Sequence, residues 1–247
     1  MLVSVVLPVR NQSDHIERVV TAYLSALEGI DHELILVVNG SNDDTLAACY
    51  RARGAATAGA VIVLESSPGW GTAVRTGLKA ARGDLLCYTN SARTAAQDLR
   101  LGVSLALAEG TQPLMVKATR RYRKSLVRRA ASLLYNLEAR NLFDLVTWDV
   151  NGTPKVFRRD LYEQMPLMER GDLIDLEVMV LCKRLDATIV GFDTDRTERA
   201  GGHSTTTPLS AIRLYWRCWQ MARRLERPVR VAGGTGASNR ARTWGDS

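Results

Sequence analysis

The first half of the chain alternates short apolar runs with segments of helical periodicity, and this alternation restricts it to a narrow set of folds. The apolar runs lie at 3–9, 34–38, 61–64, 85–88 and 114–116. Helices are expected after the first run and near 45–53, 72–82 and 95–108, with Asp14 and Glu17 forming a capping box at the first of them. Short, continuous apolar strands that alternate with helices predict a parallel sheet covered on both faces. We therefore expect an α/β fold with a Rossmann-like, mostly parallel central sheet.

The second half predicts a different set of elements. They are a helix over 120–143, an extended segment over 153–157, a buried helix over 173–182, a strand over 188–192 and a basic amphipathic helix over 208–226. Beyond Pro228, Gly, Ser, Thr and Arg dominate, which predicts a disordered tail over 228–247. The expected organisation is a single domain over 1–227, with halves at 1–118 and 119–227.

Several classes of protein are excluded by the composition of the chain. With 46% hydrophobic and 24% charged residues it has the balance of a globular protein, and no run approaches the ~18 apolar residues of a membrane-spanning helix. The N-terminus enters an apolar run directly, so no signal peptide is expected. The four cysteines, Cys49, Cys87, Cys182 and Cys218, lack metal-ligand spacing. We expect a cytoplasmic protein with reduced thiols.

The net charge of +7 is unevenly distributed. Residues 1–116 carry 9 basic and 11 acidic side chains, whereas residues 117–247 carry 24 basic and 15 acidic ones. Arginine outnumbers lysine 28 to 5, a ratio that suits phosphate recognition and that genome base composition also produces. The charge alone leaves nucleic acid, an anionic membrane and a phosphorylated small substrate as alternatives.

Polar and glycine residues cluster where the expected strands end, which is where ligands bind on such sheets. Pro8 and Arg10 can enclose a base, and the amide of Asn39 can pair with a base edge. Glycines before the third helix leave backbone N–H groups open to a pyrophosphate. The candidate nucleotide-binding residues are Pro8, Arg10, Asn39, Gly40, Ser41, Gly69, Gly71, Arg75 and Asn90. The alternative is that these are the ordinary turns of a doubly wound protein.

Three blocks in order, VVLPVRNQ, VVNGSNDDT and GWGTAVRTGLKAARGDLL, resemble the family 2 glycosyltransferases of the GT-A fold. DVNGTPKVFRRDL and RTERAGGHS are similar to segments of polyprenyl-phosphate sugar transferases of the dolichol-phosphate-mannose-synthase type. The resemblance implies a GT-A fold with a nucleotide-sugar-binding first half and an acceptor-binding second half. It implies transfer of a sugar, with inversion, from a nucleotide-diphosphate sugar to a polyprenyl-phosphate-type or other membrane-associated phosphate of cell-envelope glycan synthesis.

One block departs from the family pattern. Asn90-Ser91-Ala92 replaces the Asp-x-Asp that holds a divalent cation, and Gln12 replaces the acidic residue after the opening asparagine. An amide is a poor ligand for Mg²⁺ or Mn²⁺ and alanine is none, so we expect no metal ligands here and no certain cofactor. Either protein cations such as Arg75 and Arg93 replace the metal, or the chain is a catalytically degenerate protein that binds a nucleotide sugar or a lipid phosphate.

Asp149 corresponds to the aspartate of the family's fourth block and is the candidate general base. The alternative is an aspartate that caps the following turn. Glu177 is a lone acid in an apolar helix, expected either to function or to pair with Arg184 or Lys155. The candidate acceptor- or phosphate-binding residues are Arg120, Arg128, Lys155, Arg199 and Ser204.

The second half of the chain contains two basic segments. Seven cations and no acid lie between Lys117 and Arg129. The helix expected over 208–226 places aromatic residues on one face and arginines around the rest, including Trp216, Trp219, Arg213, Arg217, Arg223 and Arg224. This pattern suits peripheral binding to an anionic membrane on its inner face, or alternatively a solvated cationic surface. No nucleic-acid partner is expected, because no nucleic-acid-binding motif accompanies the charge.

Overall fold

A computed structural model describes residues 1–109, 114–120, 137–145, 149–194 and 208–226 of the chain, with the side chains of its last helix described from Trp216 to Leu225. Seven strands within these ranges form one sheet in the order β3-β2-β1-β4-β6-β5-β7. They are β1 (Val3–Val9), β2 (His32–Asn39), β3 (Val61–Ser66), β4 (Leu85–Tyr88), β5 (Leu114–Arg120), β6 (Lys155–Arg158) and β7 (Thr188–Thr194).

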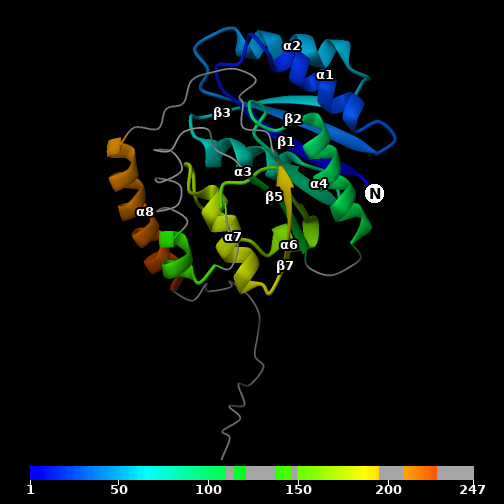
Figure 1. The fold of residues 1–247 in the computed structure, drawn as a ribbon. Helices are drawn as coiled ribbons and strands as arrows, with labels where there is room; N and C mark the ends of the chain where they lie inside the picture. The colour runs from blue at the N-terminus through cyan, green and yellow to red at the C-terminus, as the bar shows by residue number, and fades with distance from the viewer. Residues whose placement is uncertain (110–113, 121–136, 146–148, 195–207, 227–247) are drawn as a thin grey trace, which may run out of the picture.

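All of these strands are parallel except β6, which is antiparallel to both of its neighbours. Because β6 reverses direction between β4 and β5, the strands β5 and β7 run the same way as β1 to β4. The carboxyl ends of six strands therefore meet at one edge of the sheet, which we call the carboxyl edge (Figure 1). The predicted α/β class with a mostly parallel sheet is confirmed.

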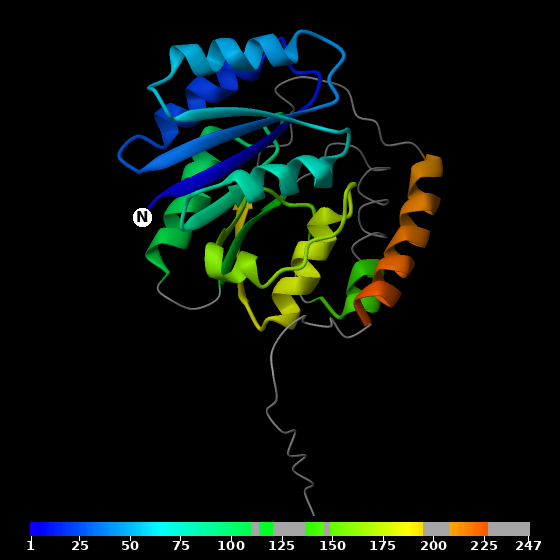
Figure 2. The same ribbon diagram turned by 180° about the vertical axis from the view of Figure 1, so that it is seen from behind.

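Helices cover both faces of the sheet (Figures 1 and 2). Helices α1 (Ile16–Ala26), α2 (Thr45–Ala55) and α4 (Ala96–Ala108) pack on one face. Helices α3 (Trp70–Ala80) and α7 (Ile174–Arg184) pack on the other. Each strand supplies both cores, because successive side chains point to opposite faces of a sheet. Val5 and Leu7 join the core under α1, while Val6 between them joins the core under α3.

The remaining helices are α6 (Arg159–Glu163), directly after β6, and α8 (Pro208–Glu226). A further helical stretch covers 137–143. Cys218, Met221 and Leu225 of α8 join the core that α7 lines. Figure 1 shows α8 as an outer helix, on a different side of the molecule from α1 and α2. Its Trp216 side is turned to solvent, with 58% of that residue exposed.

Most predicted elements lie where the sequence placed them, but two details were wrong. The strand expected over 114–116 extends to Arg120, so the long helix does not begin at that residue. The capping box does not form, since His15 precedes α1 without a capping side chain and the Asp14 carboxylate contacts His15 Nδ1 at 2.5 Å. Residues 121–136 of the expected helix and the tail over 228–247 lie outside the described residues.

All four cysteines are free thiols in buried positions, and burial raises the pKa of Cys49, Cys182 and Cys218 to about 12. Such thiols are unreactive at neutral pH. In the described part of the chain, no helix combines the length and the apolar character needed to cross a bilayer.

Candidate functional site

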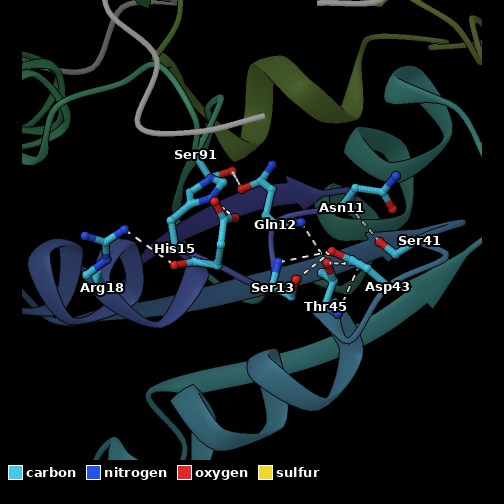
Figure 3. Close-up of polar contacts among 10 residues, drawn as sticks. Asn11, Gln12, Ser13, His15, Arg18, Ser41, Asp43, Thr45 and Ser91 are labelled. Atoms are coloured by element: carbon cyan, nitrogen blue, oxygen red, sulfur yellow. Dashed lines mark hydrogen bonds and ion pairs between the residues drawn. The ribbon is translucent and has the colours of Figure 1, made fainter. Parts of the chain in front are cut away.

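The loops that follow β1 and β2 are joined by hydrogen bonds at the carboxyl edge (Figure 3). The backbone N–H of Asn11 donates to Ser41 Oγ at 3.1 Å, and the N–H of Asn42 donates to Asn11 Oδ1 at 3.0 Å. The N–H of Gln12 donates to Thr45 Oγ1 at 2.7 Å. Asn11 has a φ of 50°, a left-handed conformation that asparagine tolerates. The two loops therefore form one continuous surface.

Asp43 is the anchor of this surface (Figure 3). Its Oδ2 accepts from Ser13 Oγ at 2.7 Å, and its Oδ1 accepts from the N–H of Thr45 at 3.1 Å. Burial alone would raise the pKa of Asp43, but the hydrogen bonds from Thr45 and Ser13 outweigh it and lower the pKa. The carboxylate therefore acts as a charged structural acceptor between two loops.

A neutral hydrogen bond lies at the turn where the sequence resemblance implies metal-binding acids. Ser91 Oγ donates to Gln12 Oε1 at 2.7 Å, and both residues are buried (Figure 3). Asn90 Oδ1 accepts from the N–H of Ala92 at 3.1 Å, closing the turn after β4. Nowhere in the described ranges do three or more His, Cys, Asp or Glu side chains gather as a metal cluster. The amide, hydroxyl and methyl groups at 90–92 do not fit a divalent cation.

The candidate base-binding residues lie at the ends of β1 and β2. Asn39 is buried, and its Nδ2 donates to the carbonyl of Val9 at 3.3 Å, which leaves Oδ1 as the acceptor. Gly40 has a φ of 68°, and a Cβ there would lie 2.5 Å from Pro68 Cγ, so the turn requires glycine. Pro8 is buried within β1, whereas Arg10 is exposed just beyond it.

The N-terminus of α3 is covered by the chain itself, contrary to the predicted open N–H groups. The N–H of Thr72 donates to the carbonyl of Arg170 at 3.0 Å. A Cβ on Gly69 would lie 2.5 Å from the same carbonyl, and one on Gly71 would lie 2.7 Å from that of Glu169. The lack of side chains at these glycines therefore allows the segment over 168–171 to pack against the start of α3. The binding of pyrophosphate by Gly69 and Gly71 remains a prediction.

Arg75 also contacts the segment over 168–171, where its Nη1 donates to the carbonyl of Met168 at 3.0 Å. The other side of the segment is held by α8, whose Arg217 pairs with Glu169. Glu177 Oε2 accepts from the N–H groups of Met168 and Glu169, and its Oε1 pairs with Arg224 at 2.6 Å. The partner expected for Glu177 was wrong, since it is neither Arg184 nor Lys155. Burial raises the pKa of Glu177 despite these donors.

Asp149 and Arg120, predicted as base and phosphate ligand, are each other's partners. Arg120 Nε donates to Asp149 Oδ2 at 2.7 Å, and Nη2 donates to Oδ1 at 2.5 Å. The N–H of Arg120 also donates to Oδ2, at 3.0 Å. Burial alone would lower the pKa of Arg120, but the hydrogen bonds and charge of Asp149 raise it. With a φ of 54°, Asp149 begins a turn whose Gly152 lies against the end of β5.

Lys155 does not line an accessible acceptor site, because it is fully buried. Its ammonium pairs with Asp175 of α7 and lies 5.4 Å from the centre of the Tyr88 ring. Asp175 Oδ1 also accepts from the Tyr88 hydroxyl at 2.9 Å, and its Oδ2 accepts from Trp70 Nε1 at 3.3 Å. Burial and the charge of Asp175 raise the pKa of Tyr88. Sequence reasoning missed Asp175, although an acid near the start of an apolar helix, two residues before Glu177, was the available signal.

Lys117 is a second buried cation beside Lys155. Sequence reasoning named it only as part of the basic segment between Lys117 and Arg129. It lies directly opposite Lys155 in the β5–β6 register and is 1% exposed. Its Nζ donates to Thr119 Oγ1 at 3.3 Å. Burial and the charge of Lys155 lower the pKa of Lys117 to about 8. Arg128, Arg199 and Ser204, the other predicted acceptor residues, lie outside the described residues.

The arrangement of the sheet and its carboxyl edge is that of the GT-A fold. A structure described as a mycobacterial protein has a TM-score of 0.68 at 21% identity, covering 95% of this chain and 80% of that one. Glucosyl-3-phosphoglycerate synthase from Mycobacterium tuberculosis, in complex with Mn²⁺, UDP-glucose and phosphoglyceric acid, has a TM-score of 0.65. It is 23% identical, with 95% of this chain and 83% of that chain covered. At these identities the likeness shows the fold.

Sequence comparison identifies the family. The sequence model described as Glycosyl transferase family 2 matches residues 4–165, and the chain belongs to this family. A curated relative, the undecaprenyl-phosphate 4-deoxy-4-formamido-L-arabinose transferase of Pseudomonas syringae pv. syringae (strain B728a), is 26% identical over 216 residues. The match covers 86% of this chain but only 63% of that relative.

Proposed function

We propose that this chain transfers a sugar from a nucleotide-diphosphate sugar to a polyprenyl-phosphate-type acceptor, with inversion at the anomeric carbon. The observation that carries the proposal is the joined carboxyl edge, where Asn11, Asp43 and the Gln12–Ser91 pair connect the loops after β1, β2 and β4. Residues 1–118 form the donor half in this proposal, and residues 119–227 form the acceptor half. The name of the Pseudomonas relative supports a polyprenyl-phosphate acceptor.

The donor is a uridine diphosphate sugar in this proposal. Asn39 offers its Oδ1 as an acceptor, and its amino group keeps a second N–H after donating to Val9. An acceptor beside a donor suits the ring N–H and the carbonyl of uracil, and the choice of uracil among the bases rests on the structural relative. The mycobacterial synthase with the same fold binds UDP-glucose. Pro8, Arg10, Gly40 and Ser41 surround the end of the same two strands and complete the base and ribose site.

Donor binding is independent of a divalent metal in this proposal. The neutral Gln12–Ser91 pair and the Asn90 turn offer the diphosphate hydrogen-bond donors instead of carboxylate-bound metal. Arg93 follows that turn directly and supplies positive charge. Amide and guanidinium groups stabilise a leaving diphosphate when they are fixed in place before the reaction.

Asp149 and Arg120 lie at the acceptor end of the same edge. A phosphate acceptor already carries a negative oxygen, so Asp149 needs only to orient the attack and little deprotonation is required. Arg120 is suited to the acceptor phosphate, because a guanidinium grips phosphate through two parallel hydrogen bonds. The acceptor phosphate oxygen bonds to the anomeric carbon as the bond from that carbon to the nucleoside diphosphate breaks, and the nucleoside diphosphate leaves with the electron pair. One such displacement inverts the configuration of the anomeric carbon.

Peripheral attachment to an anionic, cytoplasmic membrane face is proposed for α8. Trp216 is exposed, and its ring packs edge-to-face on that of Trp219 with 5.5 Å between the ring centres. The Arg223 guanidinium stacks on the same ring, with its Cζ 3.6 Å from the centre of the Trp219 ring. Exposed tryptophan with neighbouring arginine suits the headgroup layer. Arg217 and Arg224 were predicted to face the membrane, but they pair with Glu169 and Glu177.

The experiment is a transfer assay with radiolabelled UDP-sugars and farnesyl phosphate, a short polyprenyl phosphate. Transfer to farnesyl phosphate from at least one donor, and none to farnesol, is the expected result. Sedimentation with anionic vesicles, reduced in a Trp216→Ser, Arg223→Gln variant, tests the membrane part. Arg51→Gln, which changes an exposed arginine on α2, is the matched control.

A catalytically degenerate binding protein is the second candidate. It is favoured by the replaced Asp-x-Asp and by the pairing of both Asp149 oxygens with Arg120. Saturable binding of a UDP-sugar with neither transfer nor donor hydrolysis would establish this candidate and remove the transferase.

A further inference from the structure

Residues 168–171, which we call the strap, lie between the start of α3 and the outer helix α8 (Figures 1 and 2). On the α3 side, the carbonyl of Arg170 accepts from the N–H of Thr72 at 3.0 Å and from Thr72 Oγ1 at 3.3 Å. Arg75 Nη1 donates to the carbonyl of Met168 at 3.0 Å. The strap therefore uses hydrogen-bonding groups at the end of the helix where the sequence predicts the donor diphosphate.

The covered end of α3 is also packed against the base end of the proposed donor site. A Cβ on Gly40, in the turn after β2, would lie 2.5 Å from Pro68 Cγ. On the next turn of chain, a Cβ on Gly69 would lie 2.5 Å from the strap carbonyl of Arg170. Groups in such close contact cannot shift independently of one another. A donor that reaches from the base turn to the start of α3 must therefore displace the strap.

Two ion pairs tie the strap to α8, and they differ in how easily they open. Glu177 Oε2 accepts from the strap N–H groups of Met168 and Glu169. Its Oε1 pairs with Arg224, and because Glu177 is fully buried, losing that arginine would leave an uncompensated buried charge. Glu169 lies on the strap itself and pairs with Arg217, whose side chain is 37% exposed. Glu169 can move into water with the strap, so its pair is the one that a competing anion opens.

The surroundings of the Arg217–Glu169 pair suit the phosphate of an anionic lipid. Each member of the pair follows an exposed apolar residue in the chain, Trp216 at 58% and Met168 at 57% exposure. Exposed apolar side chains beside an arginine suit the headgroup layer of a membrane. A guanidinium binds phosphate through two parallel hydrogen bonds. An anionic bilayer presents many phosphates at once, and these compete with the single carboxylate of Glu169.

We propose that the Arg217–Glu169 pair is a latch that an anionic membrane opens, so that docking of α8 frees the strap and uncovers the diphosphate end of the donor site. This inference rests on the proposed function for the donor and for the membrane. While the latch is closed, the donor competes with the strap and binds weakly. When lipid phosphate holds Arg217, the strap leaves Thr72 and stays attached to the protein through Glu177. The donor is then bound where a membrane acceptor is present.

The affinity for UDP is the measurement that tests the latch. UDP is titrated calorimetrically without vesicles, with phosphatidylcholine vesicles and with vesicles that contain phosphatidylglycerol. The wild type is expected to bind UDP about tenfold more tightly with the anionic vesicles, a usual size for coupled sites, and to ignore the neutral ones. Glu169→Gln opens the latch and leaves α8 unchanged. It is expected to bind UDP tightly without vesicles and to sediment with anionic vesicles as the wild type does. Arg51→Gln, at an exposed ion pair on α2, is the matched control and should follow the wild type in all three media.

A charge exchange separates the latch from the membrane. Glu169→Arg combined with Arg217→Glu restores an ion pair but removes the cation that lipid phosphate attracts. This double variant is expected to bind UDP weakly in all three media, and tight binding without vesicles would overturn the latch.

The outcomes distinguish the latch from the proposed function. Equal UDP affinity in the wild type and Glu169→Gln without vesicles overturns the latch, whatever the transfer assay shows. A wild type that binds UDP equally in all three media also overturns it, because the membrane then does not control the strap. In both cases transfer from a UDP-sugar to farnesyl phosphate would leave the proposed function in place. If UDP binds to no variant in any medium, the proposed donor falls together with the latch.

Discussion

The two halves of the carboxyl edge are built from different chemistry. At the ends of β1, β2 and β4, amides, hydroxyls and glycine turns hold the loops, and the carboxylate of Asp43 ties the loops after β1 and β2 together. At the ends of β5 and β6, buried lysines, an arginine and two aspartates form ion pairs. The first region suits neutral recognition of a base and a diphosphate. The second region places buried charged side chains beside the proposed site of the acceptor phosphate.

This contrast means that polar substitutions have different consequences in the two regions. A buried neutral hydrogen bond that loses one partner leaves an unpaired polar group, which costs about 1–3 kcal/mol. A buried ion pair that loses one member leaves an uncompensated charge, which costs about 3–5 kcal/mol. The ion pairs at the ends of β5 and β6 are therefore the more fragile part of the edge.

Lys155→Met is expected to give the largest effect on stability. Among the described residues, the substitution leaves Asp175 with the hydroxyl of Tyr88 and the indole of Trp70 as donors. The free energy of unfolding should fall by about 3–5 kcal/mol. Arg51→Met is the control in the other half, where the ion pair with Glu17 is exposed and its loss costs about 0.2–1 kcal/mol. Urea unfolding measures both, and similar losses in the two variants would remove the contrast between the regions.

Asp149→Asn is expected to lower turnover by about 10²-fold or more while the affinity for UDP changes little. Asparagine keeps the shape of the side chain but not the charge that orients the attack. Steady-state kinetics with farnesyl phosphate and titration with UDP separate the two quantities. Full turnover in the variant would make Asp149 an anchor for Arg120 and the following turn, without a part in the reaction.

The sequence predicted the first region better than the second, for a physical reason. Asn39 is the last residue of β2 and Gly40 follows it, so the placement of Asn39 and the tight turn at Gly40 depend on local geometry that sequence spacing reveals. Lys155 and Asp175 lie on different elements, and only the packing of α7 on the sheet makes them partners. The same packing explains Gly69 and Gly71, whose neighbour over 168–171 lies a hundred residues away. Arg120 and Asp149 were singled out separately, but no spacing rule predicts that they pair.

Lys117→Met is expected to stabilise the protein at pH 7 and to change how stability depends on pH. In the folded chain the pKa of Lys117 is about 8, below the usual value of about 10.4 in an unfolded chain. Between these values the unfolded state binds the extra proton, so wild-type stability rises with pH, by on the order of 2 kcal/mol. Below pH 8 the charged lysine stays buried in the wild type, and the variant escapes that penalty.

Urea unfolding at pH 7, 8.5 and 9.5 measures the slope in both proteins. Lys79→Met, which changes an exposed lysine on α3, is the control and should follow the wild type at every pH. If the free energy of unfolding depends on pH in the same way in the wild type and in Lys117→Met, Lys117 does not titrate in this range.

Metal removal is expected to give the smallest effect, in the region without buried charge pairs. The affinity for UDP should change less than about twofold between EDTA and Mn²⁺, because amide, hydroxyl and methyl groups occupy 90–92. The matched variant is Asn90→Asp, Ala92→Asp, which restores the carboxylate pair. Its affinity for UDP should fall in EDTA, since two carboxylates then face the diphosphate, and recover with Mn²⁺.

Isothermal titration of both proteins with UDP, in EDTA and in Mn²⁺, measures these affinities. If binding to the wild type vanishes in EDTA and returns with Mn²⁺, another acid holds the metal. Asp84 precedes β4 and lies at the opposite edge of the sheet, where it accepts from the N–H of Leu2. Asp43 lies at the carboxyl edge, but metal binding would have to displace its bonds to Ser13 and Thr45.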